Sequence, residues 1–263
     1  MSSELEGRRV VVTGAATGVG RALALEAARR GAHVIAADVD DAAETVELVG
    51  DTGGTAEAAV CDVRDPDATA ALADAVGLVH VVCANAGIGV GGGVDALTLD
   101  EMRRVFDVNV FGVFNTVHAF LPGLRAARAD GASADILITG SEHSLGVPPY
   151  VPPMTAYTTS KHAVLGFAGC LRRDLADDGI GVAIACPSYV RTERLQEFAA
   201  SMPAIADTLE AYGQDADETA RRAFDGLASG DLVVPTSPVM AEFVTELHQG
   251  IIDAVQKSPA RGE

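Results

Sequence analysis

The chain has 263 residues, with 19 Lys and Arg against 37 Asp and Glu, and a formal net charge of −18 at pH 7. Because nucleic-acid binding requires a basic face that displaces counterions from phosphates, this acid excess predicts no nucleic-acid partner. With 48% hydrophobic residues, no apolar run near the roughly 20 residues of a membrane helix and no apolar signal segment at the N-terminus, the composition predicts a globular cytoplasmic protein without membrane contact.

Short apolar strands alternate with alanine-rich helices along the chain. The predicted strands are residues 9–13, 33–37, 55–60, 78–84, 135–140, 180–186 and 232–235. The predicted helices are residues 19–30, 40–49, 66–76, 99–120 and 155–177. Apolar strands that are each followed by a helix predict an α/β fold, namely a Rossmann-type doubly wound parallel sheet of about seven strands with helices on both faces. No linker separates two cores, so residues 1–263 are predicted to form a single domain.

Three segments interrupt this alternation. Residues 87–93 are rich in glycine and residues 147–153 contain four prolines. Both follow predicted strands, where open α/β sheets bind ligands. Residues 193–212 contain no strand and form either a small substrate lid or an ordinary pair of surface helices. The apolar residues in and near these segments predict a small, mainly apolar substrate; they are Leu145, Val147, Val151, Met154 and Phe198.

A glycine-rich turn joins the first predicted strand to the first helix. Its residues are Thr13, Gly14, Ala15, Ala16, Thr17, Gly18, Val19 and Gly20. Glycines in such a turn allow the backbone to approach a pyrophosphate, which then meets free N–H groups at the helix N-terminus. The spacing is GxxxGxG and differs from the common GxGxxG dinucleotide motif. Its position at the first strand–helix junction predicts a dinucleotide site.

Asp38 ends the second predicted strand, about 20 residues after the glycine turn, where a carboxylate can bind the ribose hydroxyls of a dinucleotide. It would repel the additional phosphate of NADP, and no basic residue occupies Thr17, Val39 or Asp40. We therefore expect NAD as the cofactor, with NADP less favoured. The alternative is that Asp38 only caps the following helix.

Tyr157 and Lys161 are four residues apart and therefore lie on one face of a predicted helix. An unperturbed tyrosine has a pKa of about 10, and a neighbouring cation lowers it toward the range of proton exchange near neutrality. Lys161 is one of only two lysines, the other being Lys257 near the C-terminus. This scarcity singles out the pair as a candidate catalytic site.

With these motifs the chain resembles the short-chain dehydrogenase/reductase family, in its short single-domain branch. The resemblance extends from about residue 7 to residue 235, and the motifs occur in the family's order. Besides the glycine turn and the Tyr157–Lys161 pair, they are Asp62 after the third strand, Asn85-Ala86-Gly87 after the fourth, Asn109 in the long helix, a serine after the fifth strand and Pro187 after the sixth.

The resemblance implies hydride transfer between nicotinamide and a secondary alcohol or ketone. Tyr157 would be the general acid/base, Lys161 would hold the nicotinamide ribose and lower the pKa of the tyrosine, and Asn109 would anchor a water that relays protons. The serine would bind the substrate oxygen. The implied cofactor-lining residues are Asp62 and Val63 at the adenine, Asn85, Ala86 and Gly87 along the cofactor, and Pro187, Val190 and Thr192 at the carboxamide. No metal is expected.

The position of the active-site serine stays open between two residues. Counting from the fifth strand selects Ser141, whereas the usual family spacing before Tyr157 selects Ser144. We favour Ser141, because strand ends are fixed while loop lengths vary, and residues 147–153 have the composition of an insertion of about three residues; Ser144 is the alternative. His143, between the two serines, either contacts substrate or only packs, and the neighbouring Glu142 either polarises the site or is solvated.

Other functions remain to be weighed against an NAD-dependent alcohol dehydrogenase or carbonyl reductase. An NADPH-dependent reductase of 3-oxoacyl groups on a carrier or coenzyme A is disfavoured by Asp38 and the acidic charge. A non-catalytic NAD-binding regulator is disfavoured because both Tyr157 and Lys161 are present. The resemblance further implies a homodimer or homotetramer built through the two long helices.

Overall fold

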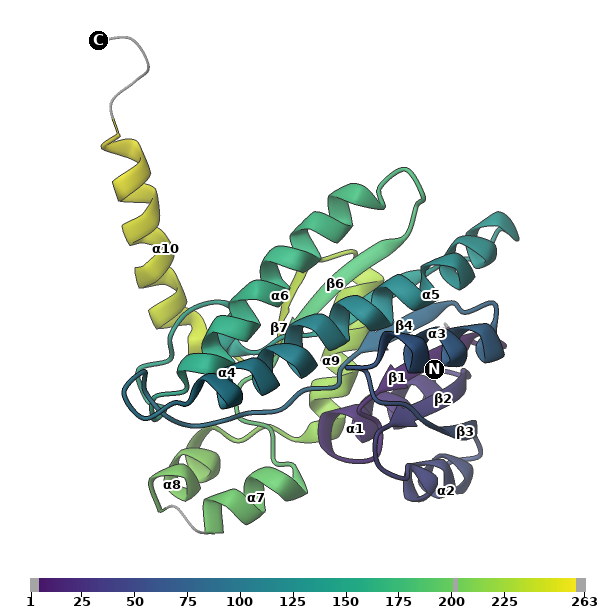
Figure 1. Cartoon of the computed structure of the whole chain (residues 1–263), viewed down its shortest axis with the longest axis horizontal. Coiled ribbons are helices and arrows are strands. Elements are labelled where there is room, and N and C mark those ends of the chain that lie inside the picture. The colour runs from purple at the N-terminus through teal and green to yellow at the C-terminus, as the bar shows by residue number, and fades with distance from the viewer. Residues whose placement is uncertain (1–4, 201–202, 259–263) are drawn as a thin grey trace.

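The computed structural model describes residues 5–200 and 203–258. At its centre is one seven-stranded parallel sheet in the order β3-β2-β1-β4-β5-β6-β7 (Figure 1). The strands are β1 (Arg9–Thr13), β2 (His33–Asp38), β3 (Thr55–Val60), β4 (Val81–Ala84), β5 (Asp135–Thr139), β6 (Gly181–Cys186) and β7 (Val233–Pro235). The strand order reverses between β1 and β4, which is where such sheets bind ligands at their carboxyl ends. The predicted Rossmann-type fold class is confirmed.

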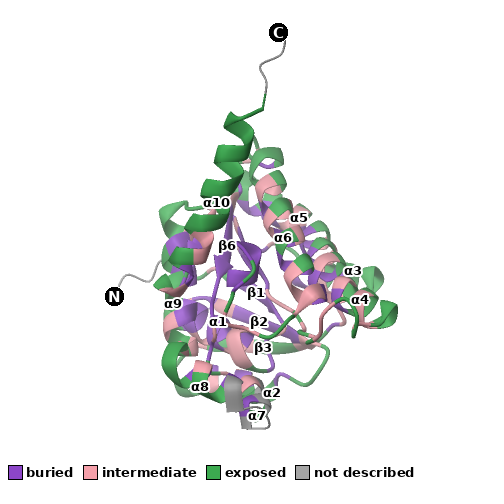
Figure 2. Ribbon diagram, turned by 90° about the vertical axis from the view of Figure 1, so that its left-hand side faces the viewer, coloured by how far each residue is buried: buried purple, intermediate pink, exposed green. Residues whose placement is uncertain are grey.

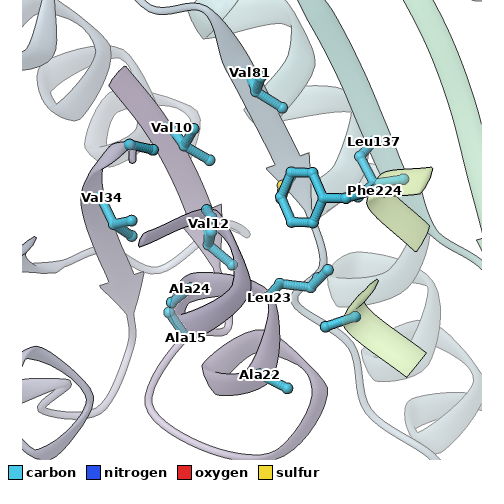
Figure 3. Packing of buried hydrophobic residues seen from close by; sticks show 14 of the residues in the cluster. Val10, Val12, Ala15, Ala22, Leu23, Ala24, Val34, Val81, Leu137 and Phe224 are labelled. Atoms are coloured by element: carbon cyan, nitrogen blue, oxygen red, sulfur yellow. The ribbon is translucent and has the colours of Figure 1, made fainter. Parts of the chain in front are cut away.

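Helices cover both faces of the sheet because successive strand residues point to opposite sides. Val10, Val12, Val34 and Leu137 face α1 (Gly18–Arg29) and α9 (Ala216–Ser229), which contribute Leu23 and Phe224 to one buried cluster (Figure 3). Val11, Ile136 and Ile184 face α3 (Pro66–Val76), α5 (Gly112–Ala129) and α6 (Thr155–Asp174) in a second cluster. The inner strands of the sheet, from β2 to β6 in its order, are accordingly the most deeply buried part of the fold, whereas the edge strand β3 is mostly exposed (Figure 2).

The long helix predicted over residues 99–120 is in fact three consecutive segments. α4 (Leu99–Phe106) begins with a capping box between Thr98 and Glu101, a π-helical turn spans Asp107–Phe111, and α5 then continues to Ala129. The π turn contains the buried Asn109. Such turns often occur at functional sites, because the additional residue redirects a side chain. The prediction of one continuous helix that ends at residue 120 was wrong.

The boundaries of the other predicted helices and strands lie within three residues of those observed. The helix predicted over residues 40–49, for example, is α2 (Ala43–Asp51). The segment proposed as a lid forms α7 (Glu193–Ala200) and α8 (Pro203–Tyr212), and residues 201–202 lie outside the described structure. Two helices had not been predicted, α9 and α10 (Ala241–Gln256). α10 projects away from the body and is exposed along most of its length (Figures 1 and 2). Among the described residues, no helix is long and apolar enough to cross a bilayer.

Candidate active site

The glycine turn between β1 and α1 has the geometry of a phosphate cradle. Gly14 has φ +68°, and a Cβ at Gly20 would lie 1.9 Å from the Gly14 carbonyl oxygen, so this turn excludes larger residues. Thr17 is the N-cap of α1, yet its side chain makes no capping hydrogen bond, and no acidic residue occupies the first turn. The first-turn N–H groups, including that of Val19, therefore have no side-chain acceptor and can receive a phosphate.

Asp38 lies against this turn and not at the start of the next helix. Its Oδ2 accepts a hydrogen bond of 2.8 Å from the Ala16 N–H, and its Oδ1 accepts one of 3.1 Å from Asp40 N–H. Because α2 begins only at Ala43, the alternative that Asp38 caps this helix does not hold. The carboxylate is instead fixed beside the glycine turn, where it fits the ribose of a dinucleotide.

Asp62 and Val63 follow β3 as expected, but the Asp62 carboxylate already has a partner. Arg64 donates to both of its oxygens, with 2.6 Å from Nη2 to Oδ2, and this pairing lowers the pKa of Asp62. A cavity of about 460 Å³ opens beside the pair and is also lined by Asp107 and Phe111. Val63 is buried, and its carbonyl accepts a hydrogen bond from Asn115.

Asn85 joins the ends of three neighbouring strands. Its Nδ2 donates to the carbonyl oxygens of Thr13 (2.9 Å) and Gly14 (3.3 Å), and its Oδ1 accepts from the Thr139 hydroxyl at 2.9 Å. Ala86 follows so closely that a Cβ at Gly14 would lie 2.8 Å from its Cα. Asn85 therefore holds the glycine turn in place, and the contributions of Thr13 and Thr139 to this contact had not been predicted.

Tyr157 lies near the start of α6, and the structure brings Ser141 to it. Ser141 directly follows the Gly140 after β5, and its hydroxyl lies close enough to the Tyr157 phenol to oppose the rise in the pKa of Tyr157. Each serine hydroxyl accepts one backbone N–H of the turn, Ser144 from Ser141 at 3.1 Å and Ser141 from His143 at 3.2 Å, but only the Ser141 hydroxyl also acts on Tyr157. This geometry supports Ser141 over Ser144 as the serine that acts with Tyr157.

Lys161 and Asn109 converge on the same region from two helices. The Lys161 Nζ donates to the Thr139 carbonyl at 2.8 Å and lies 5.6 Å from the centroid of the Tyr157 ring. The Asn109 side chain accepts a hydrogen bond of 2.8 Å from the Ile88 N–H through its Oδ1. Its Nδ2 donates to the Ile88 carbonyl at 2.9 Å and to the Ser160 hydroxyl at 3.0 Å. A Cβ at Gly87 would lie 3.5 Å from Asn109 Oδ1 and 3.6 Å from Lys161 Nζ, so Gly87 separates the two groups.

The protonation of the pair differs from the simple expectation for a tyrosine beside a cation. Burial raises the pKa of Tyr157, although the Ser141 hydroxyl opposes this shift. Burial also lowers the pKa of Lys161 to about 8. In the chain by itself, the pKa of Tyr157 is therefore not lowered, contrary to what the Lys161 charge alone led us to expect.

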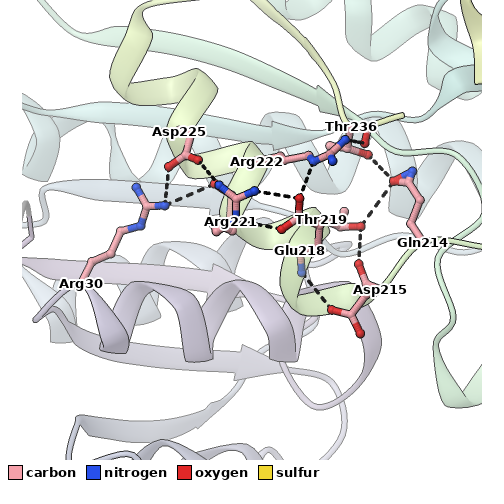
Figure 4. A network of polar contacts seen from close by, with 9 residues as sticks. All are labelled: Arg30, Gln214, Asp215, Glu218, Thr219, Arg221, Arg222, Asp225 and Thr236. Carbon is pink, nitrogen blue, oxygen red and sulfur yellow. Dashed lines mark hydrogen bonds and ion pairs between the residues drawn. The ribbon is translucent and has the colours of Figure 1, made fainter. Parts of the chain in front are cut away.

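The segment after β6 packs against both the serine turn and the glycine turn. The Pro187 carbonyl accepts from the Glu142 N–H at 2.7 Å, and the Thr192 Cγ2 would lie 3.1 Å from a Cβ at Gly18. Val190 forms a bridge with Gln214. Gln214 in turn belongs to a polar network that ties α9 to the chain after β7, in which its Oε1 accepts from Thr236 at 2.6 Å (Figure 4).

The two loops singled out by composition meet above Tyr157. Gly92 and Met154 form a parallel bridge, in which the Gly92 N–H donates to the Pro153 carbonyl at 2.7 Å. A Cβ at Gly89 would lie 3.3 Å from Met154 Cε and 3.9 Å from a carbon of the Tyr157 ring. Of the expected apolar wall, Leu145 is instead buried in the core, and the Phe198 side chain lies outside the described structure.

The turn after the serine spans Glu142–Ser144, and two of its residues, Glu142 and His143, are more deeply buried than the sequence indicated. His143 is 5% exposed, packs edge-on against the Tyr157 ring at 5.2 Å and bonds Thr158 through Nδ1 at 2.8 Å. Burial lowers its pKa to about 4, so it is neutral at pH 7. Glu142 is 2% exposed, and its Oε2 accepts hydrogen bonds from Tyr150 and from Ser188. The alternative of a solvated Glu142 is therefore wrong.

A parallel sheet in this strand order, with a glycine turn after β1 and an acidic residue ending β2, defines a dinucleotide-binding α/β protein. The particular family is shown by its model: the short chain dehydrogenase family matches residues 8–203, and the chain belongs to this family. The family binds NAD or NADP and acts on hydroxyl and keto groups.

Individual relatives agree with this assignment. The chain is 38% identical over 213 residues to a 1-deoxy-11-beta-hydroxypentalenate dehydrogenase of Streptomyces exfoliatus, covering 78% of this chain and 75% of the relative. It matches a short chain dehydrogenase/reductase of Burkholderia phymatum in complex with NAD with a TM-score of 0.84, 30% identity and 99% coverage of both chains. A putative 2-deoxy-D-gluconate 3-dehydrogenase of Agrobacterium tumefaciens with bound NADP matches with a TM-score of 0.75 and 28% identity, covering 89% of this chain and 96% of that one.

Proposed function

We propose that the protein is an NAD-dependent oxidoreductase that interconverts a small, mainly apolar secondary alcohol and its ketone. The observation that carries this proposal is the convergence of Tyr157, Ser141, Lys161 and Asn109 at the carboxyl ends of β4 and β5, next to the glycine turn. The bound nicotinamide would supply the hydride acceptor or donor. The side chains of the protein would position the substrate and the cofactor and would transfer the proton.

Each residue has a separate part in this proposal. Tyr157 exchanges the proton of the substrate hydroxyl, and Ser141, whose hydroxyl lies near the Tyr157 phenol, binds the substrate oxygen beside it. Lys161 holds the nicotinamide ribose and keeps its charge below a pH of about 8. Asn109 anchors a water on the path from Lys161. Because burial raises the pKa of Tyr157, alcohol oxidation should accelerate as the pH rises.

The cofactor preference rests on one carboxylate. Asp38 is fixed by two backbone N–H groups beside the glycine turn, where it can accept ribose hydroxyls and would repel a phosphate. Relatives occur in complex with NAD and with NADP, so the preference of this chain is a proposal. The remaining cofactor contacts follow the family's motifs at Asp62, Val63, Asn85 and the segment 187–192. The segment of α7 and α8 serves as the substrate lid of a single domain.

The proposed assembly is a homodimer or homotetramer through the outer faces of the long helices. Phe111 and Phe114 are 55% and 47% exposed on this face, and the Phe114 ring lies 6.1 Å from that of Phe167 on α6. Apolar side chains of this size are depleted on surfaces that stay in water, so they support burial by a second copy.

A kinetic screen of secondary alcohols and ketones, with NAD and NADP in parallel, tests the function. Tyr157→Phe should lower turnover by about 100-fold or more while calorimetry still detects cofactor binding. Ser141→Ala should impair turnover more than its matched control Ser144→Ala. Equal turnover by wild type and Tyr157→Phe would show that the catalytic assignment is wrong, and a strong NADP preference would overturn the role of Asp38.

A further inference from the structure

The Glu142 side chain is buried behind the candidate catalytic site and takes no part in the reaction proposed above. It directly follows Ser141 and is 2% exposed. Its Oε2 accepts a hydrogen bond of 2.9 Å from the Ser188 hydroxyl and another from the Tyr150 phenol. Placing a carboxyl group in such surroundings is costly unless several donors satisfy it. A carboxyl group held by two hydroxyls in this place therefore calls for a function.

The partners of Glu142 come from two different segments of the chain. Tyr150 belongs to the proline-rich loop, and its ring also packs against Tyr212 at the end of α8 (5.9 Å) and Phe243 at the start of α10 (6.0 Å). Ser188 belongs to the segment after β6. The Glu142 backbone adds a third link, because its N–H donates to Pro187 at 2.7 Å. One side chain thus connects the serine turn, the proline-rich loop and the segment that leads into the lid.

We propose that Glu142 is a positioning residue: its carboxylate fixes Tyr150 and Ser188 as walls of the substrate pocket and places a negative charge behind Tyr157. This inference rests on the proposed function, since it assigns Glu142 to the site where Tyr157 exchanges protons.

The charge acts on Tyr157 in a defined direction. A carboxylate nearby disfavours a second negative charge, so it opposes formation of the tyrosinate. The other groups that face Tyr157 are the Ser141 hydroxyl, the neutral His143 ring, Lys161 on its own helix and Cys186 of β6. The groups that face Glu142 are Tyr150, Ser188, Tyr157 and Tyr189. Burial raises the pKa of Glu142, and the hydrogen bonds from Tyr150 and Ser188 oppose this rise and stabilise its charged form. At the alkaline pH where a tyrosine titrates, the ionised Glu142 keeps Tyr157 protonated to higher pH, which favours the proton-donating role needed for ketone reduction.

An absorbance titration of tyrosinate, without cofactor, measures this effect directly. The difference between each protein and its Tyr157→Phe counterpart isolates Tyr157 from the other three tyrosines. Glu142→Gln keeps the shape and an acceptor oxygen but removes the charge, so it should lower the midpoint of Tyr157 by about one pH unit. The pH profile of alcohol oxidation should shift to lower pH by the same amount.

Tyr150→Phe and Ser188→Ala are the matched controls, because each removes one hydrogen bond and keeps the charge. They should raise KM for the substrate about threefold to tenfold with little change in kcat, and leave the Tyr157 midpoint unchanged. The proposal is overturned if Glu142→Gln leaves the titration midpoint of Tyr157 unchanged. It is also overturned if Tyr150→Phe shifts this midpoint as far as Glu142→Gln does.

Two further precautions keep the test decisive. If Glu142→Gln does not fold by circular dichroism, the double variant Tyr150→Phe with Ser188→Ala replaces it, and an unchanged KM then overturns the proposal. If wild type turns over no alcohol or ketone with either cofactor, the proposed function fails, whereas the absorbance titration still decides whether Glu142 acts on Tyr157.

Discussion

Replacing Asn85 by alanine tests how the glycine turn is held. The Asn85 side chain makes three hydrogen bonds, to the Thr13 and Gly14 carbonyls and to the Thr139 hydroxyl. These bonds connect the turn after β1 with the ends of β4 and β5. Alanine removes all three without adding bulk, so the perturbation is confined to the hydrogen bonds.

The expected loss follows from the number of bonds. With about 1 kcal/mol of net stabilisation for each hydrogen bond, Asn85→Ala should lower the free energy of unfolding by about 3 kcal/mol. For a chain of this size, such a change lowers Tm by about 6–12 °C. Because the turn would also lose its fixed shape, the affinity for NAD should fall as well.

Circular dichroism during thermal unfolding provides the stability measurement, since the chain contains no tryptophan for intrinsic fluorescence. Calorimetry provides the Kd for NAD. The matched control is Asn115→Ala, which removes a single hydrogen bond of 2.9 Å from Asn115 Nδ2 to the Val63 carbonyl. This control should cost about 1 kcal/mol.

Two results would refute this reasoning. If Asn85→Ala destabilised the protein no more than Asn115→Ala, the three bonds would not act together on the turn. If Asn85→Ala lost stability but bound NAD as tightly as wild type, the turn would not need this support to receive the cofactor.

Three further predictions concern cofactor choice, acid stability and assembly. Asp38→Asn should lower the ratio of kcat/KM with NAD to kcat/KM with NADP by about tenfold. An unchanged ratio in parallel assays would contradict the proposed contact between the Asp38 carboxylate and the cofactor ribose. Since burial lowers the pKa of His143 to about 4 from 6.5, the unfolded chain binds its proton first, and stability should fall by about 3 kcal/mol as the pH drops from 6.5 to 4. Denaturant titrations should show that the stability of His143→Asn falls less between pH 6.5 and pH 4 than that of wild type. An equal fall in both proteins would show that His143 is not the source of the acid sensitivity. Phe114→Glu should weaken self-association at least about tenfold in sedimentation velocity, whereas an intact oligomer would place the interface elsewhere.

The sheet could be predicted because each strand carries its own signal. Apolar runs such as residues 10–12 are buried on both faces, and the glycine turn marks where β1 meets α1. The π-helical turn at Asn109 could not be predicted, since it depends on contacts with Ile88 and Ser160 from distant segments. α10 follows the last strand, beyond the strand–helix alternation on which the sequence analysis relied.

The candidate site was predictable where the sequence places residues at the ends of elements. Asp38 and Ser141 follow strands, and Tyr157 and Lys161 share one turn of a helix, so their neighbourhood follows from the fold. The burial of Glu142 does not follow in this way. The residue type and its position in a loop indicate only a carboxylate, and its partners lie 8 and 46 residues away in sequence.

The assignment of Ser141 and the burial of Glu142 both involve the proline-rich loop. With Ser141 as the serine of the proposed site, this loop would hold the roughly three additional residues that separate Ser141 from the usual family spacing before Tyr157. The same loop carries Tyr150, whose phenol reaches back to bond the Glu142 carboxylate. Without this loop, Glu142 would keep only the Ser188 hydroxyl, and a buried carboxylate with one donor would be poorly compensated. The loop and the carboxylate therefore depend on each other, and a change in either should act on the site through the other.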